Sequence, residues 1–283
     1  MILIFGGSGF IGSYIVKELN KNNKQYTLSK TRIQNYEDVK SDIEKYKPTH
    51  IISAAGLKTP TTVDYYETHK SDLLLVNTVG NIILANLSQQ YNIHLTLIMS
   101  GCIYKYPDCN YHKSYNEDDE PNFIDSYYSN NRACTENLLN IYNNICILRL
   151  RMPISYSLHP KSLITKLINY RNIVNIPNSM TVLEDMIPFI NIVIEKKLIG
   201  KFNLVNSGVM THPSILYLYK KYVNISYNYK IIEENEQNIL AKRSNCSLKS
   251  DKVGKYMEVK NIGDSIFTIM KSYKKILDQY HLF

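Results

Sequence analysis

The first half of the chain alternates short apolar runs with longer segments in which apolar residues recur every three or four positions. The runs are typical of buried strands, and the longer segments have the period of amphipathic helices. Strands are predicted at Ile2–Phe5, Gln25–Ser29, Ile51–Ala54, Leu95–Met99 and Ile145–Leu150. The longest helices between them are predicted at Glu67–Tyr91 and Asp125–Asn144, the second with Asp125 or Ser126 as its N-cap. This order predicts an α/β fold with a doubly wound parallel sheet covered on both faces.

Beyond Arg151 the alternation loosens and a second, smaller α/β region is predicted. Its expected elements are a helix over 161–170, an extended segment over 173–176 and a turn at 177–179. A helix over 182–197 and a strand over 202–205 are expected to return to the first sheet. We therefore expect two closely packed domains with a cleft between them. The first comprises residues 1–151 with about 182–206, and the second comprises 152–181 with 207–283.

Composition and charge narrow the function classes. Hydrophobic residues make up 44% of the 283 and charged residues 20%, which supports a packed core and excludes a disordered chain. Lys and Arg number 33 against 25 Asp and Glu, and the net charge of +8 favours anionic ligands. The charge is spread out, without basic runs interleaved with aromatic residues, so no nucleic-acid partner is expected. Neither a bilayer-spanning run nor a signal peptide is apparent, so no membrane contact is expected.

Cysteine and histidine usage points to a reducing compartment without a structural metal. The five cysteines are odd in number and form no Cys-x-x-Cys pair; they stand at positions 102, 109, 134, 146 and 246. They are predicted to be free thiols in a cytoplasmic protein. The seven histidines are scattered without metal-ligand spacing, so no metal site is expected.

A glycine-rich turn joins the first strand to the first helix. Its sequence, Gly-Gly-Ser-Gly-Phe-Ile-Gly over 6–12, fits both Gly-x-x-Gly-x-x-Gly and Gly-x-Gly-x-x-Gly. Glycine lets the backbone approach a pyrophosphate closely, and the helix N-terminus offers free N–H groups to it. In this context the turn predicts a Rossmann dinucleotide site, the alternative being an ordinary strand–helix turn. The residues expected at the cofactor are Gly6, Gly9, Phe10, Ile11 and Gly12, supported by Ala54, Ala55, Gly56 and Asn77.

The end of the second strand indicates which cofactor is preferred. Sites for NAD usually carry an acidic residue about 20 residues beyond the glycines, where it binds the ribose 2′-hydroxyl. This chain has Lys30 and Arg32 there instead. Two cations suit the extra 2′-phosphate of NADPH, although they can also be solvated loop charges.

Candidate reacting residues follow the fourth strand, at the sheet edge where open α/β sheets bind ligands. If the segment stays extended, Ser100 and Cys102 point to the same side. Further along, Tyr128 and Arg132 lie four residues apart on one helical face. A Ser, a Tyr and a nearby cation form the apparatus of a short-chain dehydrogenase/reductase. The cation stabilises the phenolate so that the Tyr can exchange a proton with a carbonyl oxygen near neutral pH.

These residues resemble the extended short-chain dehydrogenase/reductases, and most closely the bifunctional UDP-4-keto-6-deoxyglucose 3,5-epimerase/4-keto-reductases, the UDP-rhamnose synthases of plants and some large viruses. The segment over 100–102 is also similar to its counterpart in GDP-fucose synthase. Matching stretches run along nearly the whole chain; they are 53–56, 101–104, 120–123, 128–129, 151–155, 164–166, 176–181 and 243–245.

The resemblance implies an activity with named residues. Cys102 would be the base that removes the C3 and C5 protons of a 4-keto sugar, and Lys166 the acid that returns them on the opposite face. Tyr128 and Ser100 would hold the carbonyl oxygen during reduction by NADPH. The substrate would be UDP-4-keto-6-deoxyglucose, bound by the matching residues Met152, Pro153 and Asn178, and the protein would be a homodimer in the cytoplasm, or in the host cytoplasm if viral. Arg243 is a candidate for the UDP pyrophosphate, because its planar fork suits phosphate.

One position departs from the family pattern, and alternatives stay open. The family has Tyr-x-x-x-Lys, whereas this chain carries Arg132 in place of the Lys. We expect reduced rather than absent hydride transfer. Without the resemblance, Cys102 is a small buried strand residue, and Lys166 and Arg243 are surface charges. The other functions to weigh are a dTDP-4-dehydrorhamnose-type reductase without epimerase activity and a non-catalytic NADP-binding regulatory subunit.

Overall fold

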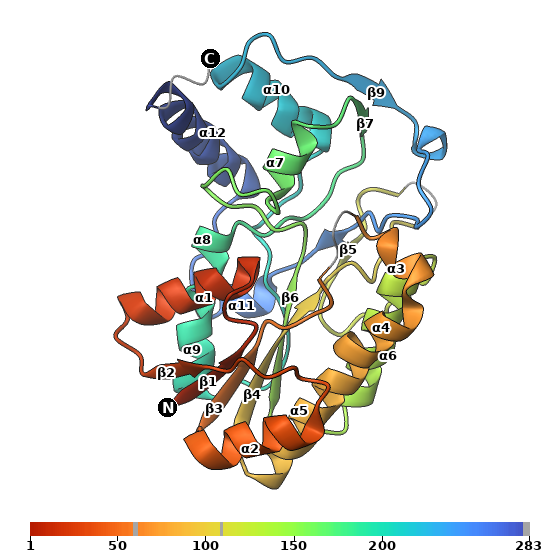
Figure 1. The fold of residues 1–283 in the computed structure, drawn as a ribbon. Coiled ribbons are helices and arrows are strands. Elements are labelled where there is room, and N and C mark those ends of the chain that lie inside the picture. The colour runs from red at the N-terminus through yellow and green to blue at the C-terminus, as the bar shows by residue number, and fades with distance from the viewer. Residues whose placement is uncertain (59–61, 108–109, 280–283) are drawn as a thin grey trace.

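A six-stranded parallel sheet forms the centre of the computed structural model, which describes residues 1–58, 62–107 and 110–279 (Figure 1). The strand order is β2-β1-β3-β4-β6-β8. The strands are β1 (Ile2–Phe5), β2 (Tyr26–Leu28), β3 (His50–Ser53), β4 (His94–Ser100), β6 (Ile145–Leu150) and β8 (Gly200–Asn203). The predicted doubly wound α/β fold is confirmed, and the strand expected near 202–205 does return to this sheet as β8. The order reverses between β1 and β3, the point where ligands bind in such sheets.

Helices cover both faces of the sheet, as its central strands, buried on both faces, require. Alternate residues of β1 face opposite sides, so that Ile2 and Ile4 pack in one layer and Leu3 and Phe5 in the other. The first layer is closed by α1 (Phe10–Lys21), α8 (Leu183–Met186) and α9 (Phe189–Lys196). The second is closed by α2 (Tyr36–Tyr46), α5 (Gly80–Gln90) and α6 (Tyr127–Leu139).

A smaller group of elements lies beyond one end of the sheet, drawn at the top of Figure 1. Its core of buried apolar residues is separate from the two sheet layers. Its helices are α7 (Leu163–Leu167), α10 (His212–Tyr222) and α12 (Ile262–Gln279), and β7 (Asn172–Val174) pairs in parallel with β9 (Lys230–Ile232). The remaining elements are β5 (Ser114–Tyr115) paired with β10 (Ser247–Leu248), the 3₁₀ turn η2 (Glu234–Glu236) and α11 (Asp251–Gly254). None of the described helices is long and apolar enough to cross a membrane.

Two predicted helices are interrupted. The segment expected as one helix over 67–91 consists of α3 (Tyr65–Thr68), α4 (Lys70–Leu74), a π-helical turn η1 (Leu75–Val79) and α5. The break falls at His69, whose Nδ1 lies 3.0 Å from the Tyr65 carbonyl oxygen, the acceptor that a continuous helix gives to a backbone N–H. The helix expected over 182–197 is split into α8 and α9 by Pro188, which has no N–H to donate.

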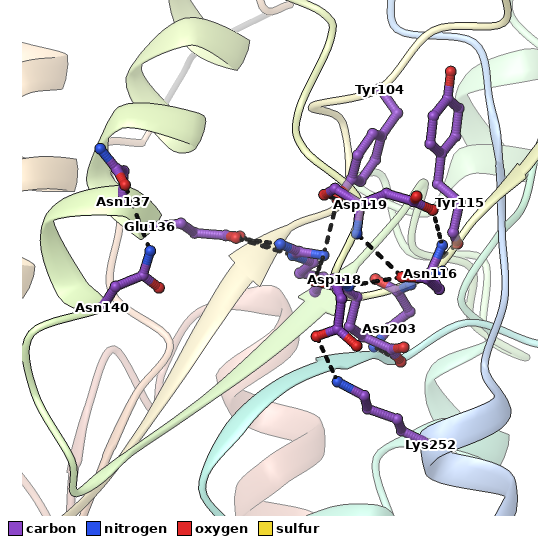
Figure 2. Close-up of polar contacts among 12 residues, drawn as sticks. Tyr104, Tyr115, Asn116, Asp118, Asp119, Glu136, Asn137, Asn140, Asn203 and Lys252 are labelled. Atoms are coloured by element: carbon purple, nitrogen blue, oxygen red, sulfur yellow. Dashed lines mark hydrogen bonds and ion pairs between the residues drawn. The ribbon is translucent and has the colours of Figure 1, made fainter.

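A buried ion pair fixes α6 to the sheet. Arg149 on β6 donates from Nη2 to Oε2 of Glu136 at 2.6 Å, and both side chains are almost completely buried. Arg149 Nη1 also donates to the Tyr104 hydroxyl at 3.1 Å. Figure 2 shows Glu136 reaching from its helix towards the strands, with Tyr104 on the far side of the contact. Tyr128 and Arg132 also lie on α6, so the Arg149–Glu136 ion pair helps to fix the position of both.

Candidate active site

The glycine turn has the geometry of a cradle that side chains would fill. Gly6 adopts φ +74°, and a Cβ there would lie 2.6 Å from the Ala55 backbone nitrogen. A Cβ on Gly12 would lie 2.1 Å from the Gly6 carbonyl oxygen. Gly9 begins α1 without a side-chain cap, so the first N–H groups of the helix, beginning at Phe10 and Ile11, receive no side-chain acceptor from it. This arrangement fits an anion at the β1–α1 turn.

The loop after β2 presents two cations. Asp42 accepts hydrogen bonds from Ser29 Oγ at 2.6 Å and from Thr31 Oγ1 at 2.9 Å, which fixes the loop on α2. Lys30 and Arg32, the residues alternating with them, are exposed. Neither has an ion-pair partner within the described ranges. The backbone that carries the two residues predicted to bind a 2′-phosphate is therefore anchored to α2, while the Lys30 ammonium and the Arg32 guanidinium are exposed.

Asn77, Gly56 and Arg132 meet beside the end of β3. Asn77, in the π-helical turn, accepts a hydrogen bond from the Leu57 N–H at 2.9 Å. A Cβ on Gly56 would lie 3.4 Å from Asn77 Oδ1 and 3.6 Å from Arg132 Nη2. The predicted cofactor residues after β3 thus adjoin the predicted catalytic cation.

Tyr128 lies between an aromatic ring and a guanidinium at the start of α6. Its ring stacks on Tyr66 with centroids 5.3 Å apart, and Arg132 Cζ lies 5.4 Å from its centroid. Arg132 donates from Nη1 to Met99 Sδ at 3.5 Å, while its buried Nε has no partner in the described structure. Burial raises the pKa of Tyr66 to about 12, Tyr128 adds to the rise, and the opposing effect of Arg132 is smaller.

The start of α6 is held by two side chains. Ser126, one of the two predicted N-caps, accepts from the Ser129 N–H at 3.3 Å. Glu67 Oε1 accepts from the Tyr127 N–H at 2.7 Å. Each acceptor satisfies a helix N–H that lacks an intrahelical partner. Both side chains therefore fix the backbone next to Tyr128.

The segment after β4 turns instead of staying extended, so the condition under which Ser100 and Cys102 would point to the same side is not met. The Ser100 Oγ accepts the Cys102 N–H at 3.1 Å, which closes the turn. This bond holds Cys102 directly beyond the sheet edge. Its Sγ accepts a hydrogen bond from Arg151 Nη1 at 3.4 Å.

A cavity of about 250 Å³ brings most of the predicted reacting and substrate residues together. Those that line it are Cys102, Tyr128, Met152, Lys166, Asn178 and Arg243. Ser100 and Arg132 do not line the cavity, but each contacts a residue that does. Ser100 accepts the Cys102 backbone N–H, and Arg132 lies over the Tyr128 ring. Pro153 is not among the lining residues, but its carbonyl accepts from the Leu163 N–H at 2.9 Å, at the start of the helix that carries Lys166.

Two of the lining residues carry a specific physical signature. Met152 adopts φ +43°, a left-handed conformation that a non-glycine residue rarely takes and that is often found at functional sites. Lys166 is exposed, yet loss of water around its ammonium lowers the pKa of this group, and Lys161 lowers it further. The direction is the one that an acid working near neutral pH requires.

Arg243 is engaged by a carboxylate. Its Nη1 and Nη2 donate to Oδ1 and Oδ2 of Asp64 at 3.1 and 3.0 Å, and Asp64 also accepts from the Ala241 N–H at 2.7 Å. Burial alone would raise the pKa of Asp64, but the hydrogen bonds from Arg243, Ala241 and Thr62 lower it to about 2. Arg243, the candidate pyrophosphate ligand that lines the cavity, is thus oriented by its ion pair with Asp64.

Sequence reasoning missed two residues of this site. Arg151 precedes the quoted Met152 and Pro153, yet nothing in a single sequence shows that its side chain folds back to Cys102. His212 lines the cavity from the start of α10, and its Nε2 is buried without a partner in the described structure. Burial, aided by Arg151, lowers the pKa of His212 to about 4, so its imidazole is neutral at physiological pH. Only the tertiary structure brings either residue to the site.

The four described cysteines are free thiols, as predicted, while Cys109 lies outside the described residues. A shallower groove of about 440 Å³ also lies on the smaller region, lined in part by Met210, Tyr217 and Tyr229. It contains none of the predicted reacting residues. Its larger volume therefore does not mark it as the reaction site.

Comparison with known proteins identifies the family of the chain. Residues 1–187 match the family model of the RmlD substrate binding domain. The chain is 36% identical over 271 residues to an Arabidopsis thaliana protein named bifunctional dTDP-4-dehydrorhamnose 3,5-epimerase/dTDP-4-dehydrorhamnose reductase, covering 93% of this chain and 90% of that protein.

Two further relatives extend the comparison. The chain is 36% identical to the Arabidopsis trifunctional UDP-glucose 4,6-dehydratase/UDP-4-keto-6-deoxy-D-glucose 3,5-epimerase/UDP-4-keto-L-rhamnose-reductase RHM1, of whose length it spans 40%. The crystal structure of the L780 UDP-rhamnose synthase from Acanthamoeba polyphaga mimivirus superposes with a TM-score of 0.90 at 33% identity, covering 96% of this chain and 98% of that one. The resemblance predicted from the sequence is confirmed, and the chain belongs to the RmlD substrate-binding-domain family of nucleotide-sugar reductases and epimerase/reductases.

Proposed function

We propose that the protein is a bifunctional 3,5-epimerase and NADPH-dependent 4-keto-reductase that converts UDP-4-keto-6-deoxyglucose to UDP-L-rhamnose. The observation that carries this proposal is that a single cavity is lined by both sets of groups. Cys102 and Lys166 are a base and an acid for epimerisation, and Tyr128 is an acid for reduction. A reductase without epimerase activity has no use for the first pair.

The residues around the glycine turn fit NADPH. A Cβ on Gly12 would fill the turn, the N–H groups at the start of α1 receive no side-chain acceptor, and Lys30 and Arg32 have no ion-pair partner in the described part of the chain. The buried Arg132 Nε has no acceptor among the described residues, which supports a partner supplied by the bound cofactor. When bound, NADPH supplies the hydride that reduces C4 of the sugar.

Epimerisation is an exchange of protons next to the ketone. The Cys102 thiolate forms an S–H bond as the C–H bond at C3 or C5 breaks, and the electron pair moves onto the C4 oxygen as an enolate. The Lys166 ammonium then gives a proton to the same carbon from the opposite face, which inverts it. Proton exchange with solvent restores both groups. The lowered pKa of Lys166 eases this donation.

Reduction uses Tyr128, which lines the same cavity. Tyr128 gives its phenolic proton to the C4 oxygen as the carbonyl is reduced, and the guanidinium of Arg132, 5.4 Å from the ring centroid, stabilises the phenolate that forms. Ser100 keeps its expected role as a second hydrogen-bond donor to the C4 oxygen. Its Oγ already accepts the Cys102 N–H at 3.1 Å, and its hydroxyl hydrogen remains available for the C4 oxygen.

Substrate binding is assigned to the smaller region. We assign residues 1–151 with 182–206 to a cofactor-binding unit and residues 152–181 with 207–283 to a substrate-binding unit, because 183–204 pack in the same core as β1 and α1. Met152 and Asn178 line the cavity that holds the sugar. Arg243 uses two nitrogens on Asp64, which leaves its Nε for the UDP pyrophosphate.

A homodimer is the assembly that the exposed apolar surface favours. Leu74, Leu75 and Val79 on α4 and η1, together with Leu138 on α6, are exposed. These helices pack against each other, as Figure 1 also shows. A second copy of the chain would cover this surface. A Leu75→Glu variant that sediments like the wild-type protein would rule out this interface. The cytoplasmic location expected from the cysteines stays a prediction.

The experiment is an incubation with UDP-4-keto-6-deoxyglucose and NADPH, followed by identification of the sugar. UDP-β-L-rhamnose is expected from the wild-type protein. The Cys102→Ala variant should oxidise NADPH while leaving C3 and C5 unepimerised. Reduction of only pre-epimerised substrate by the wild type would indicate a dTDP-4-dehydrorhamnose-type reductase. No NADPH oxidation with any 4-keto nucleotide sugar would indicate a non-catalytic NADP-binding regulatory subunit, the alternative that Arg132 in place of the family Lys favours.

A further inference from the structure

Two arginines stand two positions apart at the end of β6. One forms an ion pair with a carboxylate, and the other forms none among the described residues. Arg149 and Arg151 are both 0% exposed. Arg149 is neutralised by Glu136, to which it donates from Nε and Nη2. Arg151 has no carboxylate within ion-pair distance in any of the described segments. A buried charge without a counter-ion is unfavourable, so a group that can carry a negative charge is expected next to Arg151.

The acceptors that surround Arg151 are all neutral except one that can ionise. Nη1 donates to Ser244 Oγ at 2.9 Å and Nη2 to the Ser244 carbonyl at 2.6 Å, and Nη2 also contacts the side-chain oxygen of Asn178. The remaining acceptor is Cys102 Sγ, 3.4 Å from Nη1. These bonds orient the guanidinium, so its charge is fixed beside the sulfur.

From this geometry we infer that the Arg151 guanidinium is the counter-ion of a Cys102 thiolate and is the positioning residue that makes Cys102 a base. The inference rests on the proposed function for the reaction itself, although the charge pairing does not. A cation beside a thiol favours the ionised form; here the guanidinium is fully buried and the Cys102 thiol is half-buried.

The other titratable groups around Arg151 do not compete for its charge. Burial raises the pKa of the Cys246 thiol to about 11, despite the lowering effect of Arg151, so Cys246 stays protonated. Burial likewise raises the pKa of Tyr106, and burial with Arg151 keeps the imidazole of His212 neutral. Lys166 lines the same cavity and adds a second positive group. Cys102 is therefore the group around Arg151 that can supply a negative charge.

The test measures alkylation of Cys102 by iodoacetamide as a function of pH in the full chain, with peptide mass spectrometry and no substrate. Cys134, which is exposed on α6 and whose Sγ hydrogen-bonds to Asn130, serves as the internal reference. An Asn178→Asp variant places a carboxylate against Arg151. We expect it to raise the pH of half-maximal Cys102 alkylation by about one unit or more, with Cys134 unchanged.

Two further variants assign the effect to Arg151. Asn245→Asp adds the same charge to a residue that contacts Asn178 but not Arg151, and we expect it to move the profile much less. Arg151→Lys, which keeps the charge, should retain more of the Cys102 reactivity at neutral pH than Arg151→Met. If Arg151→Met does not fold, the comparison of Asn178→Asp with Asn245→Asp decides alone.

Superimposable Cys102 profiles for the wild type and Asn178→Asp would overturn the inference, as would equal shifts in the two Asp variants. The readout requires no turnover. A protein that passes this test but forms no UDP-rhamnose refutes the proposed function and leaves the ion pair intact. One that forms UDP-rhamnose but fails this test refutes the role of Arg151.

Discussion

At the residue scale, position 132 shows how a single departure from a family pattern changes the chemistry expected of a site. A lysine there would present a compact ammonium, whereas the guanidinium of Arg132 is planar, contacts Met99 Sδ and lies over the Tyr128 ring. The positive charge is kept. The number and direction of the donors that remain for a cofactor are different.

The Arg132→Lys variant is expected to raise the rate of hydride transfer. The smaller ammonium restores the donor that the family pattern has at this position, and the charge beside Tyr128 is preserved. The measurement is single-turnover loss of NADPH absorbance with a 4-keto nucleotide sugar. Arg132→Met, which removes the charge, is the control and should be slower than both. A slower rate for Arg132→Lys than for the wild type would mean that the arginine is adapted to its surroundings.

Lys166 is expected to give epimerisation a high-pH limb. Its folded-state pKa is lowered, so the ammonium is lost at a pH below that of an ordinary lysine, and proton return should weaken as pH rises through that value. Solvent deuterium incorporation at C3 and C5, measured against pH, tests this. Lys166→Met should lose about 10²- to 10⁴-fold of the exchange rate.

The Lys161→Met variant provides the control for that profile. Lys161 lowers the pKa of Lys166 through charge repulsion, so its removal should move the limb to higher pH. A limb that stays in place in Lys161→Met and persists in Lys166→Met would assign the titration to another group.

At the element scale, the β1–α1 turn is the feature most sensitive to substitution. Gly12→Ala is expected to abolish NADPH binding, because its Cβ would lie 2.1 Å from the Gly6 carbonyl oxygen and must displace the turn. Gly254→Ala, in α11, is the matched control, since a Cβ there meets nothing within 4 Å. Quenching of protein fluorescence or calorimetric titration with NADPH measures the difference. Equal affinities for the two variants would mean that the turn does not cradle the cofactor.

The sequence predicts strands better than helices in this chain. Strands such as β1 and β4 are mostly apolar because they are buried on both faces, and that pattern needs no tertiary information. The breaks at His69 and at the π-helical turn depend on local hydrogen bonds that periodicity does not report. The family resemblance points to Cys102 and Lys166, which the residues alone do not single out. Residues that contact these side chains, such as Arg151 beside Cys102, come from distant segments. Only the folded structure shows that they are close.

At the scale of the whole molecule, a buried histidine pair couples stability to pH. His50 and His94 face each other at the start of β3 and β4, the sheet edge opposite the active site. Their rings lie 4.5 Å apart, and His50 Nε2 is 2.8 Å from Thr96 Oγ1. Burial lowers the pKa of His50 to about 3, with His94, Lys197 and the chain N-terminus adding to the effect. The folded protein therefore holds His50 neutral where the unfolded chain protonates it.

Stability is expected to fall as the pH falls from about 6.5 towards 3. In that window His50 is protonated in the unfolded state and neutral in the folded state. One such group changes the free energy of unfolding by about 1.4 kcal/mol per pH unit. Urea unfolding across this range should show a shallower dependence in His50→Gln than in the wild type. His112→Gln, at an exposed position, is the control. Parallel pH dependences for wild type and His50→Gln would contradict the assignment.

The claim that one cavity performs both reactions can be tested by a single incubation of the wild-type protein in D₂O with UDP-4-keto-6-deoxyglucose and NADPH. The account predicts UDP-β-L-rhamnose carrying solvent deuterium at both C3 and C5, with one NADPH consumed per sugar. A reduced sugar without deuterium at those carbons, or exchange at C3 and C5 without any NADPH consumption, would contradict it.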